Sequence, residues 1–361
     1  MRVQKYRYFS EKMNNIAYKK RIPLHAMFEL TYRCNFRCIH CYNTREEKLS
    51  YKKELRTHEV FNILGQLQEM GCIYLGFTGG EIFCREDMAE ILWKAKKLGF
   101  QIIVLTNGSF IDEKIANELG RIRPNKIDIT VNAMNEDRFE KITGTPGSYT
   151  KVFNAIRLLY EKKIPICVKT CGMQENKNEI IAINKFARTL NAAFRFDGKL
   201  TPRHDRLKTP LQHLISPKET YYLHRQCYPE MFEKYDHSGK ERKGAKLDRR
   251  NIKRLFNCAV GYYDLAVNPY GELKFCINID YPRYKILEGS LEKGWENLKN
   301  IVDSLKPPDD WACKECDLVN YCAWCPGTGY LEDGSFSTCD PLSREEAKFI
   351  RTIERNRNAK K

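Results

Sequence analysis

Three cysteines stand close together near the start of the chain, in a run that reads TYRCNFRCIHC. Cys34, Cys38 and Cys41 have the spacing CxxxCxxC, which closes a tight loop. Such a loop can offer three thiolates to one iron–sulfur cluster and leave one iron without a protein ligand, open to a small molecule. Clusters that only transfer electrons usually take four cysteines. Structural zinc also needs four closed ligands, so the run favours an open iron–sulfur cluster over zinc.

A second group of seven cysteines lies in the last third of the chain: Cys258, Cys276, Cys313, Cys316, Cys322, Cys325 and Cys339. Four of them form two CxxC pairs that could make a zinc site. Zinc ribbons usually separate such pairs by about 15–20 residues, a much wider gap than the one here. A closed zinc site also needs only four ligands, so zinc would leave three of these cysteines unexplained.

The composition is that of a soluble globular protein, with 42% hydrophobic and 30% charged residues in 361. The segment Met1–Arg21 is polar and basic, without the apolar stretch of a secretory signal, and no apolar run is long enough to span a membrane. We therefore expect a cytoplasmic protein, where disulfides are rare and clustered cysteines bind metals. Five of the fifteen cysteines lie singly and are expected to be buried, inert thiols: Cys72, Cys84, Cys167, Cys171 and Cys227.

The formal net charge is +16, and the basic residues concentrate in Lys5–Arg21, in Lys240–Arg254 and in the tail from Arg344. Such a charge would attract an acidic partner, either nucleic acid or a peptide rich in Asp and Glu. It can equally be a solvated surface that keeps the protein soluble. No nucleic-acid-binding motif decides between these interpretations.

Short apolar runs alternate with helix-period segments in the first two hundred residues, which predicts parallel strands joined by right-handed helical connections. The expected strands are His25–Thr31, Ile73–Phe77, Gln101–Leu105, Lys126–Val131, Pro165–Thr170 and Ala193–Phe196. The expected helices are Thr57–Met70, Asp87–Leu98, Glu113–Leu119, Tyr149–Glu161 and Asn178–Leu190, with another around Pro217–Glu233. Because only six units are visible, we expect an α/β fold with an open, partial (β/α)6 TIM-like barrel.

Polar residues follow several of these strands where the strands end. Gly79, Gly80 and Glu81 follow the second strand, Asn107 follows the third and Asn132 follows the fourth. In parallel sheets the chemistry lies at the carboxyl ends of the strands, so these residues and the cysteine loop should meet on one rim. Glycines there let backbone groups approach a ligand, and a carboxylate can accept from an ammonium group.

The chain divides into five expected parts. These are a basic N-terminal segment (1–24), the partial barrel (25–200), a less regular bridge (201–257), a small cysteine-rich domain (258–342) and a basic tail (343–361). The run Thr143–Tyr149 (TGTPGSY) is expected to be a turn in which Ser148 caps the next helix.

The cysteine loop and the Gly-Gly-Glu motif one βα unit later resemble the radical S-adenosylmethionine (SAM) superfamily, over about Phe28–Phe196. The resemblance implies that Cys34, Cys38 and Cys41 hold a four-iron–four-sulfur cluster whose open iron chelates SAM. It also implies a set of SAM-contacting residues: His40, Gly79, Gly80, Glu81, Asn107 and Asn132. The family usually has Pro after this Glu, and Ile82 stands there instead.

The second cysteine group is similar to the SPASM domain, a C-terminal extension of radical SAM enzymes that modify peptides and proteins. The resemblance implies two auxiliary clusters. Cys313, Cys316, Cys322 and Cys339 would close one, and Cys258, Cys276 and Cys325 would hold the other, with an open iron or a residue such as Asp264 as its fourth ligand. The family places three residues between its fifth and sixth cysteines, where this chain has two, so the role of Cys325 departs from the pattern.

The family resemblance implies reductive cleavage of SAM and abstraction of a hydrogen atom from a peptide or protein, which leads to an oxidative modification such as a thioether, carbon–carbon or ether cross-link. It also implies an electron donor such as flavodoxin or ferredoxin. Ile277 stands where sulfatase-maturating members carry an acidic residue, which disfavours that activity. About 25 residues precede the first strand, too few for a leader-recognition domain, so we expect a separate leader-binding partner or direct binding of an acidic leader.

Two other interpretations stay open. One is a radical SAM/SPASM enzyme that acts on a small molecule or a cofactor-assembly intermediate. The other is a non-catalytic metal- or nucleic-acid-binding protein, which the charge of +16 would suit.

Overall fold

The computed structural model describes residues 2–44, 54–230 and 254–358. Its first half alternates strands and helices as the sequence predicts. The six strands are β1 (His25–Thr31), β2 (Tyr74–Gly79), β3 (Gln101–Thr106), β4 (Lys126–Thr130), β5 (Ile166–Cys171) and β6 (Ala193–Asp197). Each begins within one residue of its predicted start, because a buried apolar run bounded by turn residues marks it clearly.

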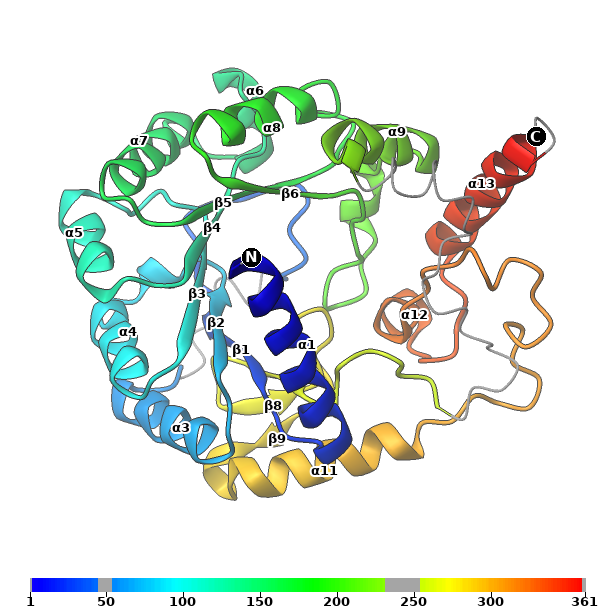
Figure 1. The fold of residues 1–361 in the computed structure, drawn as a ribbon, viewed down its shortest axis with the longest axis horizontal. Helices are drawn as coiled ribbons and strands as arrows, with labels where there is room; N and C mark the ends of the chain where they lie inside the picture. Colours follow the sequence, from blue (N-terminus) through cyan, green and yellow to red (C-terminus); the bar gives the residue numbers. More distant parts are fainter. Residues whose placement is uncertain (1, 45–53, 231–253, 359–361) are drawn as a thin grey trace.

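All six strands are parallel and pair in sequence order from β6 to β1. Helices form the outer layer of the arc in Figure 1, and apolar side chains fill the space between the two layers. These helices are α3 (Thr57–Glu69), α4 (Met88–Lys97), α5 (Glu113–Ile122), α7 (Ser148–Glu161) and α8 (Ile180–Thr189). The predicted fold class, a partial (β/α)6 barrel, is confirmed.

Three short strands extend the sheet beyond β1, and the sequence did not predict them. They are β7 (Asp264–Val267), β8 (Glu272–Lys274) and β9 (Tyr284–Lys285). Strand β7 is parallel to β1, whereas β8 and β9 are antiparallel to their neighbours, which gives a nine-stranded sheet in the order β6-β5-β4-β3-β2-β1-β7-β8-β9. The C-terminal part of the chain is therefore continuous with the barrel through backbone hydrogen bonds.

Several helices were also not predicted. They are α1 (Arg2–Lys20), α6 (Glu136–Thr143), α11 (Leu291–Ser304), α12 (Pro326–Asp333) and α13 (Pro341–Asn358). The predicted helix at Pro217–Glu233 is α9 (Pro217–Cys227), and its expected last turn lies outside the described residues. The basic run Lys240–Arg254 also lies outside them, except for Arg254.

The predicted cap of α7 is wrong in detail. Gly147, with φ +72°, is the N-cap, and Ser148 is the first helical residue. The Ser148 hydroxyl lies 2.8 Å from the Thr143 hydroxyl, so it joins α7 to the end of α6.

The N-terminal end of the sheet is packed against α1. The Asn14 side chain lies 3.2 Å from the His25 ring at the start of β1, and Tyr18 stacks on Tyr262 with ring centroids 4.6 Å apart. The guanidinium of Arg254 also lies beside this pair, 4.3 Å from the Tyr262 centroid. Polar and aromatic contacts therefore cover the end of the barrel opposite the predicted chemistry.

The cysteine-rich region lies beside the open side of the arc, with α12 and α13 to the right in Figure 1. Residues 305–325 contain neither helix nor strand. Among the described residues, none of the helices is long and apolar enough to cross a membrane.

Candidate functional site

The loop Cys34–Cys41 lies directly after β1, at the carboxyl end of the strand. Its three cysteines are all partly exposed. The Cys41 amide donates to the Cys38 carbonyl at 3.2 Å, which turns the loop back on itself. The predicted cysteine loop therefore presents its thiols at the rim of the barrel, where a ligand can reach them.

The middle of this loop is fastened to the end of α6. The Arg37 amide donates to the Thr143 carbonyl at 2.8 Å, and the Ile39 amide donates to the Ile142 carbonyl at 3.1 Å. The side chain of Phe36, just before Arg37, is buried. Two backbone bonds and one apolar anchor thus hold the segment around Cys38, the second of the three cysteines.

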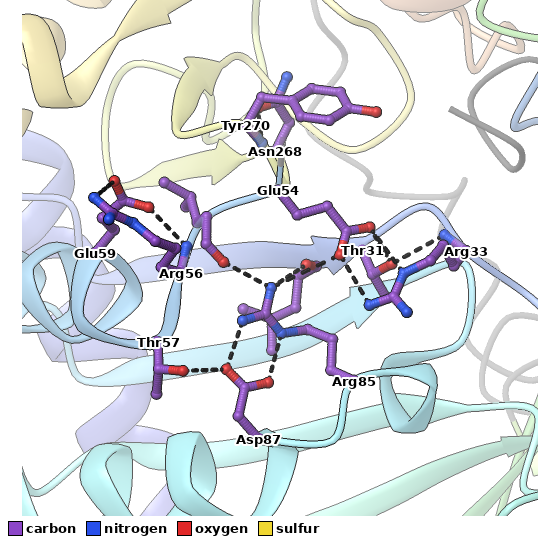
Figure 2. A network of polar contacts seen from close by, with 12 residues as sticks. Thr31, Arg33, Glu54, Arg56, Thr57, Glu59, Arg85, Asp87, Asn268 and Tyr270 are labelled. Atoms are coloured by element: carbon purple, nitrogen blue, oxygen red, sulfur yellow. Dashed lines mark hydrogen bonds and ion pairs between the residues drawn. The ribbon is translucent and has the colours of Figure 1, made fainter. Parts of the chain in front are cut away.

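A polar network holds the other side of the loop, just before Cys34 (Figure 2). Arg85, whose side chain is only 5% exposed, donates to the carbonyls of Leu30 at 3.2 Å and Leu55 at 3.0 Å. The same guanidinium pairs with Asp87 at 2.6 Å. A buried arginine with its donors satisfied in this way fixes the last residues of β1 relative to the segment that leads into α3.

Glu54 extends the network to the residues that adjoin Cys34 (Figure 2). It accepts from the Thr31 hydroxyl at 2.5 Å and pairs with the Arg33 guanidinium at 3.0 Å. Sequence reasoning missed Arg85 and Glu54, because no local motif marks them; only the fold brings them to the end of β1.

The Gly-Gly-Glu segment packs against the backbone that leads into the cysteine loop. The Gly80 amide donates to the Thr31 carbonyl at 2.7 Å, and the Glu81 amide donates to the Arg33 carbonyl at 2.8 Å. A Cβ atom at Gly79 or Gly80 would collide with these carbonyl oxygens. The close approach that only glycine permits is therefore made here to the protein's own backbone.

Glu81 is fully buried and joins the ends of β2 and β3. Its carboxylate accepts from the Thr106 hydroxyl at 2.7 Å, the Asn107 amide at 2.6 Å and the Phe83 amide at 3.2 Å. Burial raises the pKa of Glu81 to about 6, against the opposing effect of these hydrogen bonds. In this arrangement the buried Glu81 carboxylate holds the ends of β2 and β3 together at the rim of the barrel.

Asn107 reaches from the end of β3 to the cysteine loop. Its side-chain amide donates to the side-chain oxygen Oδ1 of Asn35 at 3.0 Å and points at the Cys34 sulfur at 3.9 Å. The Phe36 amide also points at this sulfur, at 3.4 Å. Donors directed at a sulfur favour its thiolate form, which is the form that binds metals.

Asn132 lies at the carboxyl end of β4 and is 2% exposed. Its side-chain oxygen has no hydrogen-bond partner among the described residues. The fully buried Asn176, which sequence reasoning missed, donates to the carbonyls of Asn132 at 2.8 Å and Cys171 at 2.9 Å. An unpartnered buried amide oxygen at this edge fits a donor supplied by a ligand, such as a hydroxyl group. The remaining predicted contact, His40, lies partly exposed between Cys38 and Cys41.

Four of the C-terminal cysteines line one cavity: Cys313, Cys316, Cys322 and Cys339. Leu318, Val319, Trp324 and Arg344 complete its wall. In the described ranges, no three His, Cys, Asp or Glu side chains converge tightly enough to hold a single metal ion. Thiols that surround a space suit a multi-iron cluster better than one zinc ion, whose sulfur ligands sit about 2.3 Å from the metal.

The other three cysteines of this region also lie near one another. Burial raises the pKa of the Cys276 thiol to about 12, and the neighbouring Cys325 and Cys258 add to that rise. Asp264, the suggested fourth ligand, lies at the start of β7, with its carboxylate 4.0 Å from the His25 ring. Burial raises the pKa of Asp264 to about 6.

The five single cysteines fall outside these groups. Cys72, Cys167 and Cys227 are buried, and Cys84 and Cys171 are partly buried. Burial raises the pKa of Cys72 to about 12 and of Cys227 to about 11, which keeps these thiols protonated and unreactive at neutral pH.

The sequence profile described as "Radical SAM superfamily" matches residues 28–187. The chain is 27% identical to the antilisterial bacteriocin subtilosin biosynthesis protein AlbA of Bacillus subtilis over 319 residues, which cover 86% of this chain and 66% of AlbA. It is 22% identical to the AdoMet-dependent heme synthase of Methanosarcina barkeri over 336 residues, which cover 88% of this chain and 95% of that protein.

Among solved structures, the fold is similar to that of Streptococcus suis SuiB bound to its precursor peptide SuiA. The TM-score is 0.67 at 14% identity, over 92% of this chain and 79% of SuiB. At this identity the likeness shows the fold, which includes both the barrel and the cysteine-rich region.

Proposed function

We propose that this chain, as a radical SAM enzyme, carries out an oxidative modification of a peptide or protein, such as a thioether, carbon–carbon or ether cross-link. The family implies SAM and a four-iron–four-sulfur cluster as cofactors. The observation that carries the proposal is the cysteine-lined cavity, formed by four of the seven cysteines that the family's core does not need. Two of the similar proteins point the same way, since AlbA is named for bacteriocin biosynthesis and SuiB is bound to a precursor peptide.

The residues at the barrel rim fit these cofactors. When bound, the cluster and SAM supply a radical that removes a hydrogen atom from carbon, and auxiliary clusters supply an acceptor for the electron that the oxidation releases. Cys34, Cys38 and Cys41 would hold the first cluster, because three partly exposed thiols lie in one turn at the open end of the sheet. Three thiolates leave one iron free for the SAM amino and carboxylate groups.

Three rim residues would position SAM. The unpartnered Asn132 oxygen would accept from a ribose hydroxyl, and His40 would lie near the adenine. Asn107 would act on the cluster side, through the donor that it directs at Cys34. Because Glu81 is buried and its oxygens already accept three hydrogen bonds, the Gly79–Glu81 segment would meet the methionine amino group through its backbone.

The C-terminal cysteines would hold two auxiliary clusters. Cys313, Cys316, Cys322 and Cys339 would close one of them, since all four thiols line one cavity. Cys258, Cys276 and Cys325 would hold the other and leave a position for a fourth ligand. The buried aromatic pair Trp311 and Trp324, with ring centroids 5.3 Å apart, would exclude water from the closed site.

Two sets of substitutions test this assignment in anaerobically reconstituted protein. Replacing Cys34, Cys38 and Cys41 by Ala should abolish the formation of 5′-deoxyadenosine from SAM and dithionite. Replacing Cys313 and Cys316 by Ala should leave that cleavage within about threefold of wild type and stop the modification of a co-expressed neighbouring peptide, as followed by mass spectrometry. If the Cys313/Cys316 variant still modified the peptide, the electron-acceptor role of the second group would be wrong.

A second function is favoured by one comparison. The chain aligns with 95% of the length of the heme synthase, a protein named for a small-molecule product. A small substrate such as a tetrapyrrole would need no leader sequence. One assay distinguishes the two functions, namely the formation of deoxyadenosine with each candidate substrate. A rate that rises when an iron porphyrin precursor is added, and does not rise with any peptide encoded nearby, would favour the small-molecule function.

A further inference from the structure

The cysteine loop of the barrel and the Cys276 segment are joined by two polar links, one on each side. The first lies upstream of both cysteines. Lys274 on β8 pairs with Glu29 on β1 at 2.6 Å, and both side chains are fully buried. The Tyr32 hydroxyl completes the link, because it donates to Glu29 at 3.1 Å and lies 3.4 Å from the Lys274 ammonium.

The second link lies downstream of both cysteines and passes through one residue of the bridge. The His204 amide donates to the Tyr42 carbonyl at 3.0 Å. The ring nitrogen Nε2 of the same residue lies 3.1 Å from the Ile277 carbonyl, so Nε2 must carry the proton and donate. Tyr42 follows Cys41 directly, and Ile277 follows Cys276 directly.

The ring of His204 makes a third contact with the cysteine loop. Its centroid lies 5.1 Å from the Tyr42 ring centroid, at an interplanar angle of 55°. One residue therefore contacts the backbone next to each of two predicted metal ligands, through its amide at Tyr42 and through its ring at Ile277. The same ring also packs against the Tyr42 side chain.

The bridge holds His204 in a tight turn. The Arg206 amide donates to the Arg203 carbonyl at 2.8 Å, and the Asp205 carboxylate accepts from the Leu207 amide at 3.1 Å. Lys208, just after the turn, pairs with Glu332 on α12. The turn is thus fastened to the cysteine-rich region as well as to itself, which leaves His204 little freedom to follow a movement of either cysteine segment.

We propose that His204 is a positioning residue that sets the separation between the loop Cys34–Cys41 and the segment Cys276–Ile279. Its consequence for catalysis rests on the proposed function: the group held at one segment would receive an electron released by chemistry at the other, and that exchange requires a fixed separation. The pair of Lys274 and Glu29 fixes the strands that precede the two segments. His204 fixes the backbone that follows the two cysteines, at Tyr42 and Ile277.

Three variants of one position separate the contributions of the ring and the donor. His204→Phe keeps a ring against Tyr42 and removes the Nε2 donor. His204→Gln keeps a donor for the Ile277 carbonyl and removes the ring, and His204→Ala removes both. His58→Phe on α3 is a matched control, because His58 is exposed and lies outside both segments.

The test is hydrogen–deuterium exchange of the full-length chain as purified anaerobically. We expect His204→Ala to raise exchange about tenfold in peptides that cover Tyr42–Thr44 and Ile277–Ile279, since one hydrogen bond contributes about 0.5–1.5 kcal/mol. His204→Phe should raise it by a similar factor at Ile277–Ile279 alone, because Phe keeps the ring contact with Tyr42. His204→Gln should show a smaller rise, and His58→Phe none. Unchanged exchange in both segments of His204→Ala, or a rise in only one of them, would overturn the proposal.

A second measurement on the same variants keeps this proposal apart from the assignment of the enzyme. SAM cleavage with dithionite needs no peptide, and it should stay within about twofold of wild type in His204→Phe, because the ring of His204 contacts Tyr42 and Ile277, which are not among the predicted SAM-binding residues. A loss of more than about tenfold would place His204 inside the SAM site and contradict a positioning role. If the wild-type protein itself forms no deoxyadenosine, the proposed function fails, whereas the exchange result still decides the role of His204.

Discussion

The barrel and the cysteine-rich region fill their interiors with different side chains. The barrel core is continuous and aliphatic, with fully buried residues such as Ile63, Leu75 and Val104 between sheet and helices. The segment 305–325 has no helix or strand, and it supplies three of the four cysteines that line the cavity. Apolar burial contributes about 25 cal/mol per Å², so the barrel has a large source of stability of its own. The segment 305–325 buries fewer apolar side chains, so we expect it to depend more on the group that its thiols bind.

The largest expected effect tests this difference between the two regions directly. Replacing Cys313 and Cys316 by Ala should remove the group that fills the cavity, and the local protection of 305–340 against hydrogen exchange should fall by two orders of magnitude or more. Strands β1 to β6 should keep their protection, because their buried side chains pack mainly against the helices of the barrel. Hydrogen exchange measured by mass spectrometry on anaerobic protein checks both expectations. An equal loss of protection in the barrel strands would show that the two regions fold as one unit.

The next effect concerns the boundary between the regions. Lys274→Met leaves the buried Glu29 carboxylate without its cation, which should lower the free energy of unfolding by about 3–5 kcal/mol. Urea denaturation followed by circular dichroism measures it.

The double variant Glu29→Leu/Lys274→Met is the control for this pair. It removes both charges, so it should recover most of the loss. If the double variant were as unstable as Lys274→Met, the cost would come from packing and not from an unpaired charge.

A pH effect of intermediate size belongs to the barrel alone. Burial raises the pKa of Glu81 from its usual 4.5 to about 6, so the folded protein binds the proton more tightly than the unfolded chain. This group's contribution is therefore greatest below pH 4.5 and is lost as the pH rises to about 6, a change of about 2 kcal/mol. Glu81→Gln should lack this dependence and should be less stable at pH 7, because its amide would face the Asn107 amide.

Stability measured at pH 4.5 and 6.5 in both proteins isolates the Glu81 contribution, since all other groups are shared. The same slope in the variant as in wild type would mean that Glu81 is ionised throughout this range.

The smallest effect concerns the contact of α13 with the barrel. Lys199, just after β6, pairs with Glu346 at 2.6 Å in a partly exposed site. Lys199→Met should cost about 1 kcal/mol or less, because solvent screens such pairs. Faster exchange should be confined to α13, and a global loss of stability would show that this helix supports the barrel core.

The sequence predicted the barrel well because each parallel strand is an apolar run that repeats at the spacing of a βα unit. It did not predict β7 to β9, which are only two to four residues long and whose pairing depends on a strand more than two hundred residues earlier. Helix α6 was missed for a similar reason, since only Phe139, Ile142 and Thr143 of its eight residues are buried. Short elements give too little periodicity to be recognised alone.

For the site, local motifs identified the cysteine groups and the polar residues after β2, β3 and β4. They could not reveal that Glu81 faces inward, or that Arg85, Asn176 and His204 tie the rim together, because those contacts join distant parts of the chain. One signal was present: Glu29 is a charged residue inside the mostly apolar strand β1, and its pairing with Lys274 accounts for it.

Strand β1 lies inside the sheet, with β2 on one side and β7 on the other. During synthesis on the ribosome, β2 emerges soon after β1, but β7 follows only after more than two hundred further residues. Until then one edge of β1 is open, with unpaired amide and carbonyl groups beside the buried side chains Phe28 and Leu30. A nascent chain halted before residue 264, or a fragment cut there for expression, would expose that edge and be prone to aggregate.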